Sequence, residues 1–161
     1  MIFNTKRNLE AGIGRRERGI AAVEFAVILP VLVAVIAGLL LFGRFCWHYT
    51  VAQKAAHDAA LYLSSVPLID MKSRARAEAV MDVARAIALA ETAELNPGPN
   101  GTTITVTCDS WPCDGAVVPT TIRVGIRMRL VDGVLDAFTG DYTGEEGMLL
   151  TADVSMNYVG N

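Results

Sequence analysis

An uncharged run of nineteen residues, Phe25 to Gly43, constrains this chain more than any other feature. A helix rises 1.5 Å per residue, so the run would span about 28 Å, close to the thickness of a bilayer's hydrocarbon core. Pro30 lies inside it. Proline breaks a helix in water but is tolerated in a membrane helix, often as a kink. The sequence has no second run of this kind, so we expect a single-pass membrane protein.

The distribution of charge predicts the orientation of that helix. Residues 1–19 hold five basic and two acidic residues, a net charge of +3; the whole chain carries −3, so the remainder carries −6. Lys and Arg beside a membrane segment favour the cytoplasmic side. We therefore expect the N-terminus inside and everything after residue 44 outside. An acidic outer part argues against nucleic acid as a partner, because nucleic acid binding needs a basic patch.

One carboxylate, that of Glu24, stands at the start of the apolar sequence. An ionised group at the centre of a membrane segment costs roughly 2.5–3.5 kcal/mol and commonly marks function. If the chain were cut after Gly19, Ile20 would gain an amino group four residues before Glu24, on the same helix face. The ammonium of a neighbouring copy or partner could then pair with this carboxylate and offset its desolvation. The simpler alternative places Glu24 in the headgroup region without a role.

Basic residues, a glycine, four apolar residues and a Glu-Phe pair precede the long apolar run: Arg15, Arg16, Arg18, Gly19, Glu24 and Phe25. This order resembles the cleavage motif of type IV prepilins. The form Gly-Ile-Ala-Ala-Val-Glu-Phe-Ala, followed by Val-Ile-Leu-Pro, is similar to the TadE-like (TadE or TadF) proteins of tight-adherence, Flp-type pilus systems. The major pilins of those systems are very short, whereas more than a hundred residues follow the helix here, which suits a minor pilin or pseudopilin.

The resemblance implies a role for each residue of the motif. Gly19 would precede the bond cut by prepilin peptidase, and Ile20 would become the new N-terminus. Glu24 and Phe25 would serve subunit register and docking, and the basic residues would hold the leader in the cytoplasm. The implied partners are the membrane, prepilin peptidase, other pilin or pseudopilin subunits and pilus assembly platform proteins. The implied location is the bacterial inner membrane, with a periplasmic C-terminal domain; no catalysis and no cofactor are expected.

Two other interpretations of the N-terminus remain open. Val35-Ile36-Ala37 has the small residues of a secretory cleavage site, which would give a chain starting at Gly38. An uncut helix would make the protein a single-pass, membrane-anchored periplasmic binding or interaction module.

The rest of the chain predicts an α+β fold of the type IV pilin layout. Residues 20–66 are expected to form one helix, with a small-residue face in its second half: Ala52, Ala55, Ala56, Ala59, Ala60 and Leu63. A second helix is expected over Asp70–Glu94, with an apolar stripe of Val80, Val83, Ala84 and Ile87. The Pro- and Gly-rich segment 96–101 ends it.

The apolar period then changes from 3.6 to 2, which predicts strands. They are expected over Thr102–Cys108, Thr121–Leu130 and Leu149–Tyr158, forming a small antiparallel sheet against the helices. The predicted organisation is a cytoplasmic leader (1–19), a transmembrane helix (20–43), a helical stalk or helix pair (44–95) and a β-rich extracytoplasmic domain (96–161). Val134–Phe138 is apolar and short, and is expected to be a helical turn or a packed loop.

Cys108 and Cys113 flank a turn-forming loop and are expected to form a disulfide outside the cytoplasm. Two thiols without a nearby histidine or a second pair are a poor zinc set. Cys46 is expected to be a buried or lipid-facing thiol. His48 and His57 are nine residues apart, on opposite helix faces, and are expected to be interfacial or solvated.

Five acidic residues in a glycine-rich stretch offer oxygen ligands: Asp132, Asp136, Asp141, Glu145 and Glu146. Their spacing does not match an EF-hand loop, so a solvated acidic loop is favoured over a calcium site, and no metal site is predicted. Asn100-Gly101-Thr102 fits a glycosylation pattern and equally a turn.

Overall fold

The computed structural model describes the backbone of residues 5–95, 97, 101–130 and 147–160, and their side chains from Ile20 onward. The chain divides into two compact units, Met1–Phe42 and Gly43–Asn161. The apolar stretch 134–138, the acidic residues of 132–146 and the asparagine of the glycosylation pattern lie outside the described residues.

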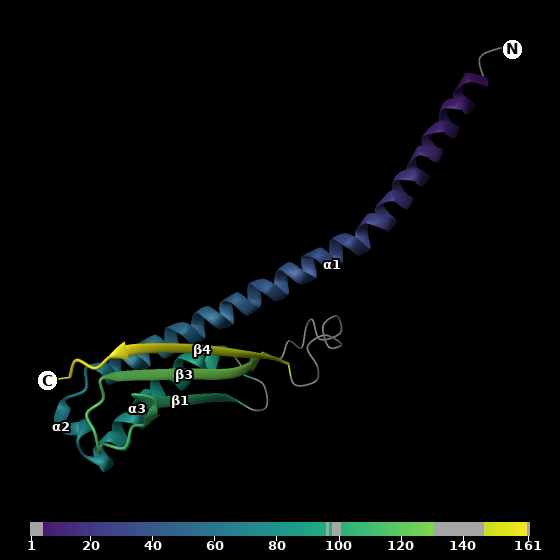
Figure 1. Ribbon diagram of the computed structural model, residues 1–161. Helices are drawn as coiled ribbons and strands as arrows, with labels where there is room; N and C mark the ends of the chain where they lie inside the picture. The colour runs from purple at the N-terminus through teal and green to yellow at the C-terminus, as the bar shows by residue number, and fades with distance from the viewer. Residues whose placement is uncertain (1–4, 96, 98–100, 131–146, 161) are drawn as a thin grey trace. The chain divides into compact units, whose positions relative to one another are not determined.

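The first unit is a single helix, the N-terminal part of α1, which spans Thr5–Ser64 (Figure 1). The expectation that this helix begins at residue 20 is wrong, because helical backbone continues back to Thr5. Residues 5–19 contain no proline and several strong helix formers (Lys, Arg, Glu, Leu and Ala), which favour continuation of the helix. The helix passes through Pro30, as expected for a membrane segment.

The second unit begins with a helical layer. It contains the end of α1, then α2 (Leu68–Met71), α3 (Arg74–Thr92) and the short 3₁₀ helix η1 (Ala93–Leu95). The predicted single helix over 70–94 is therefore broken after α2. Ser73 causes the break with an extended backbone (φ −117°, ψ 122°) at the N-cap of α3, where serine is favoured.

The buried face of α3 differs from the predicted stripe. Its buried residues are mostly small: Ala77, Met81, Ala84, Ala88 and Thr92. Val83, expected inside, is 45% exposed. Alanines allow a close approach between packed elements, so the size of the side chains, and not their hydrophobicity alone, decides which face turns inward.

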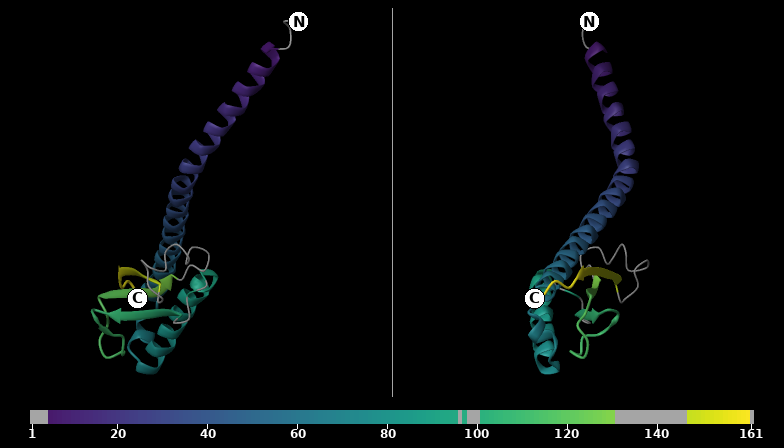
Figure 2. Two further views of the ribbon diagram at one scale, coloured as in Figure 1. Left: turned by 90° about the vertical axis from the view of Figure 1, so that its right-hand side faces the viewer. Right: turned by 60° about the vertical axis from the view of Figure 1, so that its left-hand side comes forward.

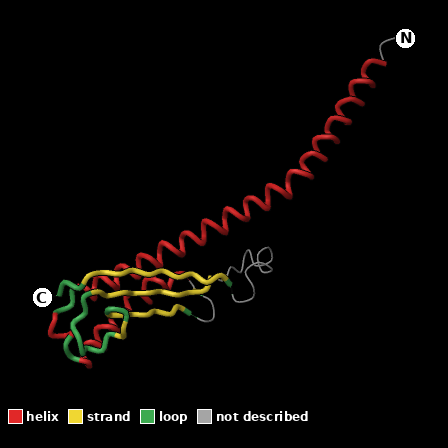
Figure 3. The backbone as a smooth tube through the Cα atoms, viewed as in Figure 1, coloured by secondary structure: helices red, strands yellow, loops and turns green. Residues whose placement is uncertain are grey.

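All four strands of the second unit form one antiparallel sheet in the order β2-β1-β3-β4 (Figure 3). Their bounds are β1 Thr102–Cys108, β2 Trp111–Pro112, β3 Thr121–Leu130 and β4 Met148–Asn157. The first and third match the predicted ranges, and β4 is shifted by one residue. The two-residue strand β2 was not predicted, because it is too short to show a period.

The core of the second unit lies between the helices and one face of the sheet (Figure 2). The predicted small-residue face of α1 is fully buried: Ala52, Ala55, Ala56, Ala59, Ala60 and Leu63. The sheet contributes the predicted alternate residues of β3, namely Ile122, Val124, Ile126 and Met128, with Leu150 and Ala152 from β4. Burial of apolar area, at about 25 cal/mol per Å², is the main force that holds the two layers together.

Candidate functional site

The helix from Ile20 to Phe42 displays apolar side chains on all sides. Ile20, Val23 and Phe25 are each more than 60% exposed, and exposure continues along the segment. Within the described residues, one helix is long and apolar enough to cross a membrane. Apolar surface of this extent is costly in water, so the segment needs a lipid or protein environment.

Glu24 is the one acidic residue on this apolar segment, and its side chain is exposed. Among the described side chains it has no ion-pair partner. Ile20 lies four residues earlier, on the same face of the helix. Ile20 has only an amide in the uncut chain, so an ammonium for Glu24 requires cleavage and a second molecule. Gly19 and the basic residues 15, 16 and 18 fall within α1, and their surroundings lie outside the described side chains.

A second feature is the loop between β1 and β3, closed by the predicted disulfide. Cys108 and Cys113 are bonded, with Cα atoms 5.0 Å apart. The Asp109 carboxylate accepts hydrogen bonds from the backbone N–H groups of Thr120 and Thr121, both at 2.8 Å. The Asp109 N–H donates to the Thr121 carbonyl oxygen at 2.9 Å. These bonds tie the start of the loop to its end.

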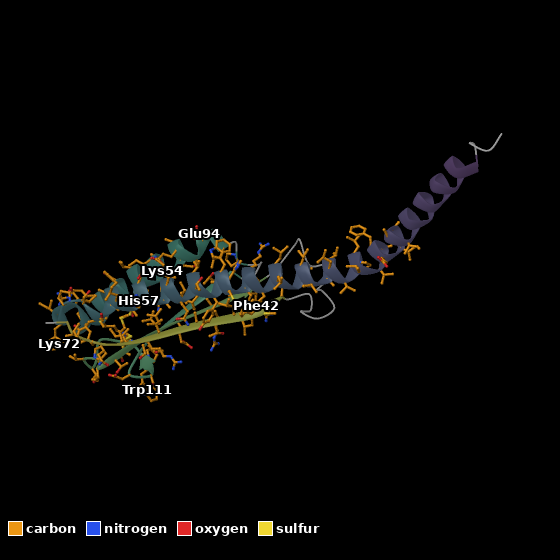
Figure 4. All side chains as sticks on the ribbon, turned by 90° about the horizontal axis from the view of Figure 1, so that it is seen from above. Phe42, Lys54, His57, Lys72, Glu94 and Trp111 are labelled. Atoms are coloured by element: carbon orange, nitrogen blue, oxygen red, sulfur yellow. A yellow bond between two sulfur atoms is a disulfide. The ribbon has the colours of Figure 1, made fainter. Side chains whose placement is uncertain are left out.

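Within this loop Trp111 is 76% exposed beside a hollow of about 510 Å³. Figure 4 shows it projecting away from Lys54 and Glu94 on the helices. Arg74, the first residue of α3, lines the hollow together with both half-cystines. Asp109 and Ser110 adopt left-handed backbone, with φ of 49° and 74°, a conformation that costs energy for residues other than glycine. Sequence reasoning identified the disulfide and missed the exposed tryptophan.

His48 contradicts the expectation of a solvated side chain. It is 3% exposed, with Nδ1 2.8 Å from the Arg44 carbonyl oxygen and Nε2 3.3 Å from that of Leu95. It therefore joins α1 to the end of η1. His57, on the opposite face, is exposed as expected. No three His, Cys, Asp or Glu side chains come together as a metal site within the described part of the chain.

A charged cluster joins α1 to α3 at the surface. The Lys54 ammonium lies 3.0 Å from a carboxylate oxygen of both Asp58 and Glu91. The hydrogen bond to Asp58 and then that to Glu91 raise the pKa of Lys54. The same bond to Lys54, followed by one from His57, lowers the pKa of Asp58. Exposed pairs of this kind contribute little to stability, typically below about 1 kcal/mol.

Together these observations define the class: an α+β protein whose one candidate membrane helix precedes a small two-layer unit. Residues 19–61 match the family model of TadE-like protein, which confirms the resemblance drawn from the motif. The match begins at the glycine of that motif and ends within the buried alanine face, so it covers less than half of the chain. No curated protein and no solved structure matches. The TadE-like match suggests a component associated with the Tad pilus, and the candidate membrane helix suggests membrane association.

Proposed function

We propose that the protein is a minor pilin-like (pseudopilin) component of the tight-adherence pilus assembly machinery. The observation that carries the proposal is the coincidence of three features at one place. A prepilin-like Gly-Ile bond, an unpaired carboxylate four residues later and the start of the TadE-like match all fall at the beginning of an exposed apolar helix. In this role the chain is a peptidase substrate and a structural subunit, not an enzyme.

The proposed mechanism starts with removal of residues 1–19 by prepilin peptidase at the cytoplasmic face. The new ammonium of Ile20 in one subunit then pairs with Glu24 of a neighbour within the bilayer. An unpaired carboxylate is costly in hydrocarbon, and a paired one much less so, so lateral association is favoured over the isolated subunit. Phe25 and the exposed apolar residues that follow supply the packing surface between helices.

The second unit would lie in the periplasm of the bacterium, after a single inner-membrane span. The Cys108–Cys113 disulfide supports this location, because disulfides persist in oxidising compartments and are rare in the cytosol. The N-terminal basic residues support a cytoplasmic N-terminus. Other pilus subunits or platform proteins would be the contacts of this unit.

Replacement of the residue before the cut tests the proposal. Gly19→Phe is expected to block maturation and abolish piliation, because the peptidase needs a small residue there. Gly38→Phe is the matched control: it makes the same change in the same helix, where an added Cβ meets no atom within 4 Å. It should leave processing intact.

N-terminal sequencing of the membrane-extracted protein separates the alternatives. A start at Ile20 supports the proposal, and a start at Gly38 indicates a secretory signal. A start at Met1 leaves an anchored periplasmic interaction module, for which the exposed Trp111 beside its hollow would be the natural contact surface.

A further inference from the structure

The strand β4 forms one edge of the sheet and lacks the features that usually protect an edge. It pairs with β3 through ten consecutive residue pairs, and none of the described strands pairs with its other side. It contains no proline and no basic residue. Its one charged side chain, Asp153, is held by Arg123 of β3 at 3.2 Å. Such an edge offers a row of backbone N–H and C=O groups to a further strand.

The opposite edge of the sheet is open over part of its length. The short strand β2 pairs only with Thr107 and Cys108 of β1. In the described chain, the remainder of β1, Thr102–Val106, therefore has no neighbour on that side. This segment reads Thr-Thr-Ile-Thr-Val, uncharged and entirely β-branched, a composition favoured in strands. The sheet thus has two edges able to accept a strand.

The directions of the strands decide how two copies could use these edges. Both β1 and β4 run antiparallel to β3, so they are parallel to each other. Copies anchored in one membrane share one orientation, a step that rests on the proposed function. Antiparallel pairing of β4 with β4 of a second copy would turn one copy over. Pairing of β4 with β1 of a second copy keeps both copies upright, with their helical layers on the same face.

We propose that β4 of one copy pairs in parallel with the Thr102–Val106 edge of a second copy, so that the two sheets become continuous. Backbone hydrogen bonds would supply the affinity, as in other cases of strand addition. The contact is heterologous, because it joins two different edges. The second copy still has its own β4 free, so repetition builds a row or a ring of subunits.

Disulfide trapping between separately tagged copies tests this arrangement. One copy carries Thr103→Cys or Thr105→Cys on β1, the other Thr151→Cys or Ser155→Cys on β4, all in a Cys46→Ser background. These four side chains are exposed on the sheet face away from the helices. After mild oxidation of intact membranes, at least one of the four pairings is expected to give a covalent heterodimer. The control combines Thr151→Cys with Arg127→Cys, which lies on the central strand β3 and reaches no edge.

Two results would overturn the inference: no heterodimer in any pairing, or a homodimer of the Thr151→Cys copy without the mixed species. Retention of the native Cys108–Cys113 bond in each variant verifies that the sheet has formed. The proposed function fails separately. A heterodimer of chains that still begin at Met1 would support the pairing and refute processing. Chains that begin at Ile20 without a heterodimer would do the reverse.

Discussion

Tyr158 donates its phenolic hydrogen to the Val66 carbonyl oxygen at 2.7 Å, and so ties the end of the chain to the residues that follow α1. The Val159 N–H donates to the Ser64 carbonyl oxygen at 3.0 Å beside it. These carbonyls lie at the end of a helix, where intrahelical donors are missing. The C-terminal residues therefore complete the hydrogen bonding of α1 and hold β4 against the helical layer.

Removal of that hydroxyl should weaken the second unit. Tyr158→Phe is expected to lower the free energy of unfolding by about 1 kcal/mol, since the ring stays and a carbonyl loses its donor. Chemical denaturation of the full chain in detergent micelles measures it. Tyr62→Phe is the control, because the Tyr62 hydroxyl has no hydrogen-bond partner among the described residues. An equal effect of both substitutions would contradict the assignment.

The same tyrosine predicts a dependence on alkaline pH. Burial, and then the negative charge of Asp70, raise the pKa of Tyr158 above its ordinary value. The folded state thus favours the neutral phenol, and the unfolded chain loses this proton at lower pH. The contribution of Tyr158 to stability is complete below about pH 10 and is lost as pH rises through the raised pKa. Unfolding curves at about pH 8 and pH 11 should differ more for wild type than for Tyr158→Phe.

Gly115 is predicted to be irreplaceable in the disulfide loop. Its φ is +74°, and an added Cβ would lie 2.9 Å from the backbone nitrogen of Arg74. Gly115→Ala is expected to destabilise the second unit by more than about 1 kcal/mol, since backbone cannot yield easily. Gly101→Ala is the control, with a similar φ of +64° and no atom within 4 Å of the new Cβ. Thermal unfolding should rank Gly115→Ala clearly below Gly101→Ala; equal values would exclude the contact.

Loss of the disulfide should be felt mainly in stability. Opening the short loop between Cys108 and Cys113 is expected to cost about 2 kcal/mol on the chain-entropy estimate. The paired substitution to serine, compared with wild type in reducing agent, measures it by denaturation. Cys46→Ser, which removes the free thiol, is the control. If reducing agent lowers the stability of the double variant as much as that of wild type, the effect does not come from this bond.

Glu24→Gln is expected to leave cleavage after Gly19 intact and to reduce lateral assembly. The amide keeps the size of the side chain and removes the charge that would pair with the Ile20 ammonium. N-terminal sequencing reports cleavage, and cross-linking in intact membranes reports assembly. Glu78→Gln, on the exposed face of α3, is the matched control. Normal assembly of Glu24→Gln would refute the proposed pairing.

Several elements of this protein were predictable because their signal is local. Strand β3 alternates apolar and basic residues over its whole length, so both its range and its buried face follow from period 2. The buried alanine face of α1 follows from helical spacing, and the disulfide from two cysteines around a turn. The apolar segment, with its glycine and carboxylate, predicted the TadE-like match.

Other elements depend on what packs against them, and these only the tertiary structure decided. The face of α3 is set by close packing of small side chains, so Val83 points outward although it is more hydrophobic than Ala84. The burial of His48 depends on the carbonyl of Leu95, forty-seven residues away, which no local pattern shows. The exposure of Trp111 depends on a loop held by Asp109 and a distant strand. Local periodicity thus determined the elements and the membrane segment, whereas side-chain size and long-range hydrogen bonding determined how the second unit packs and what it exposes.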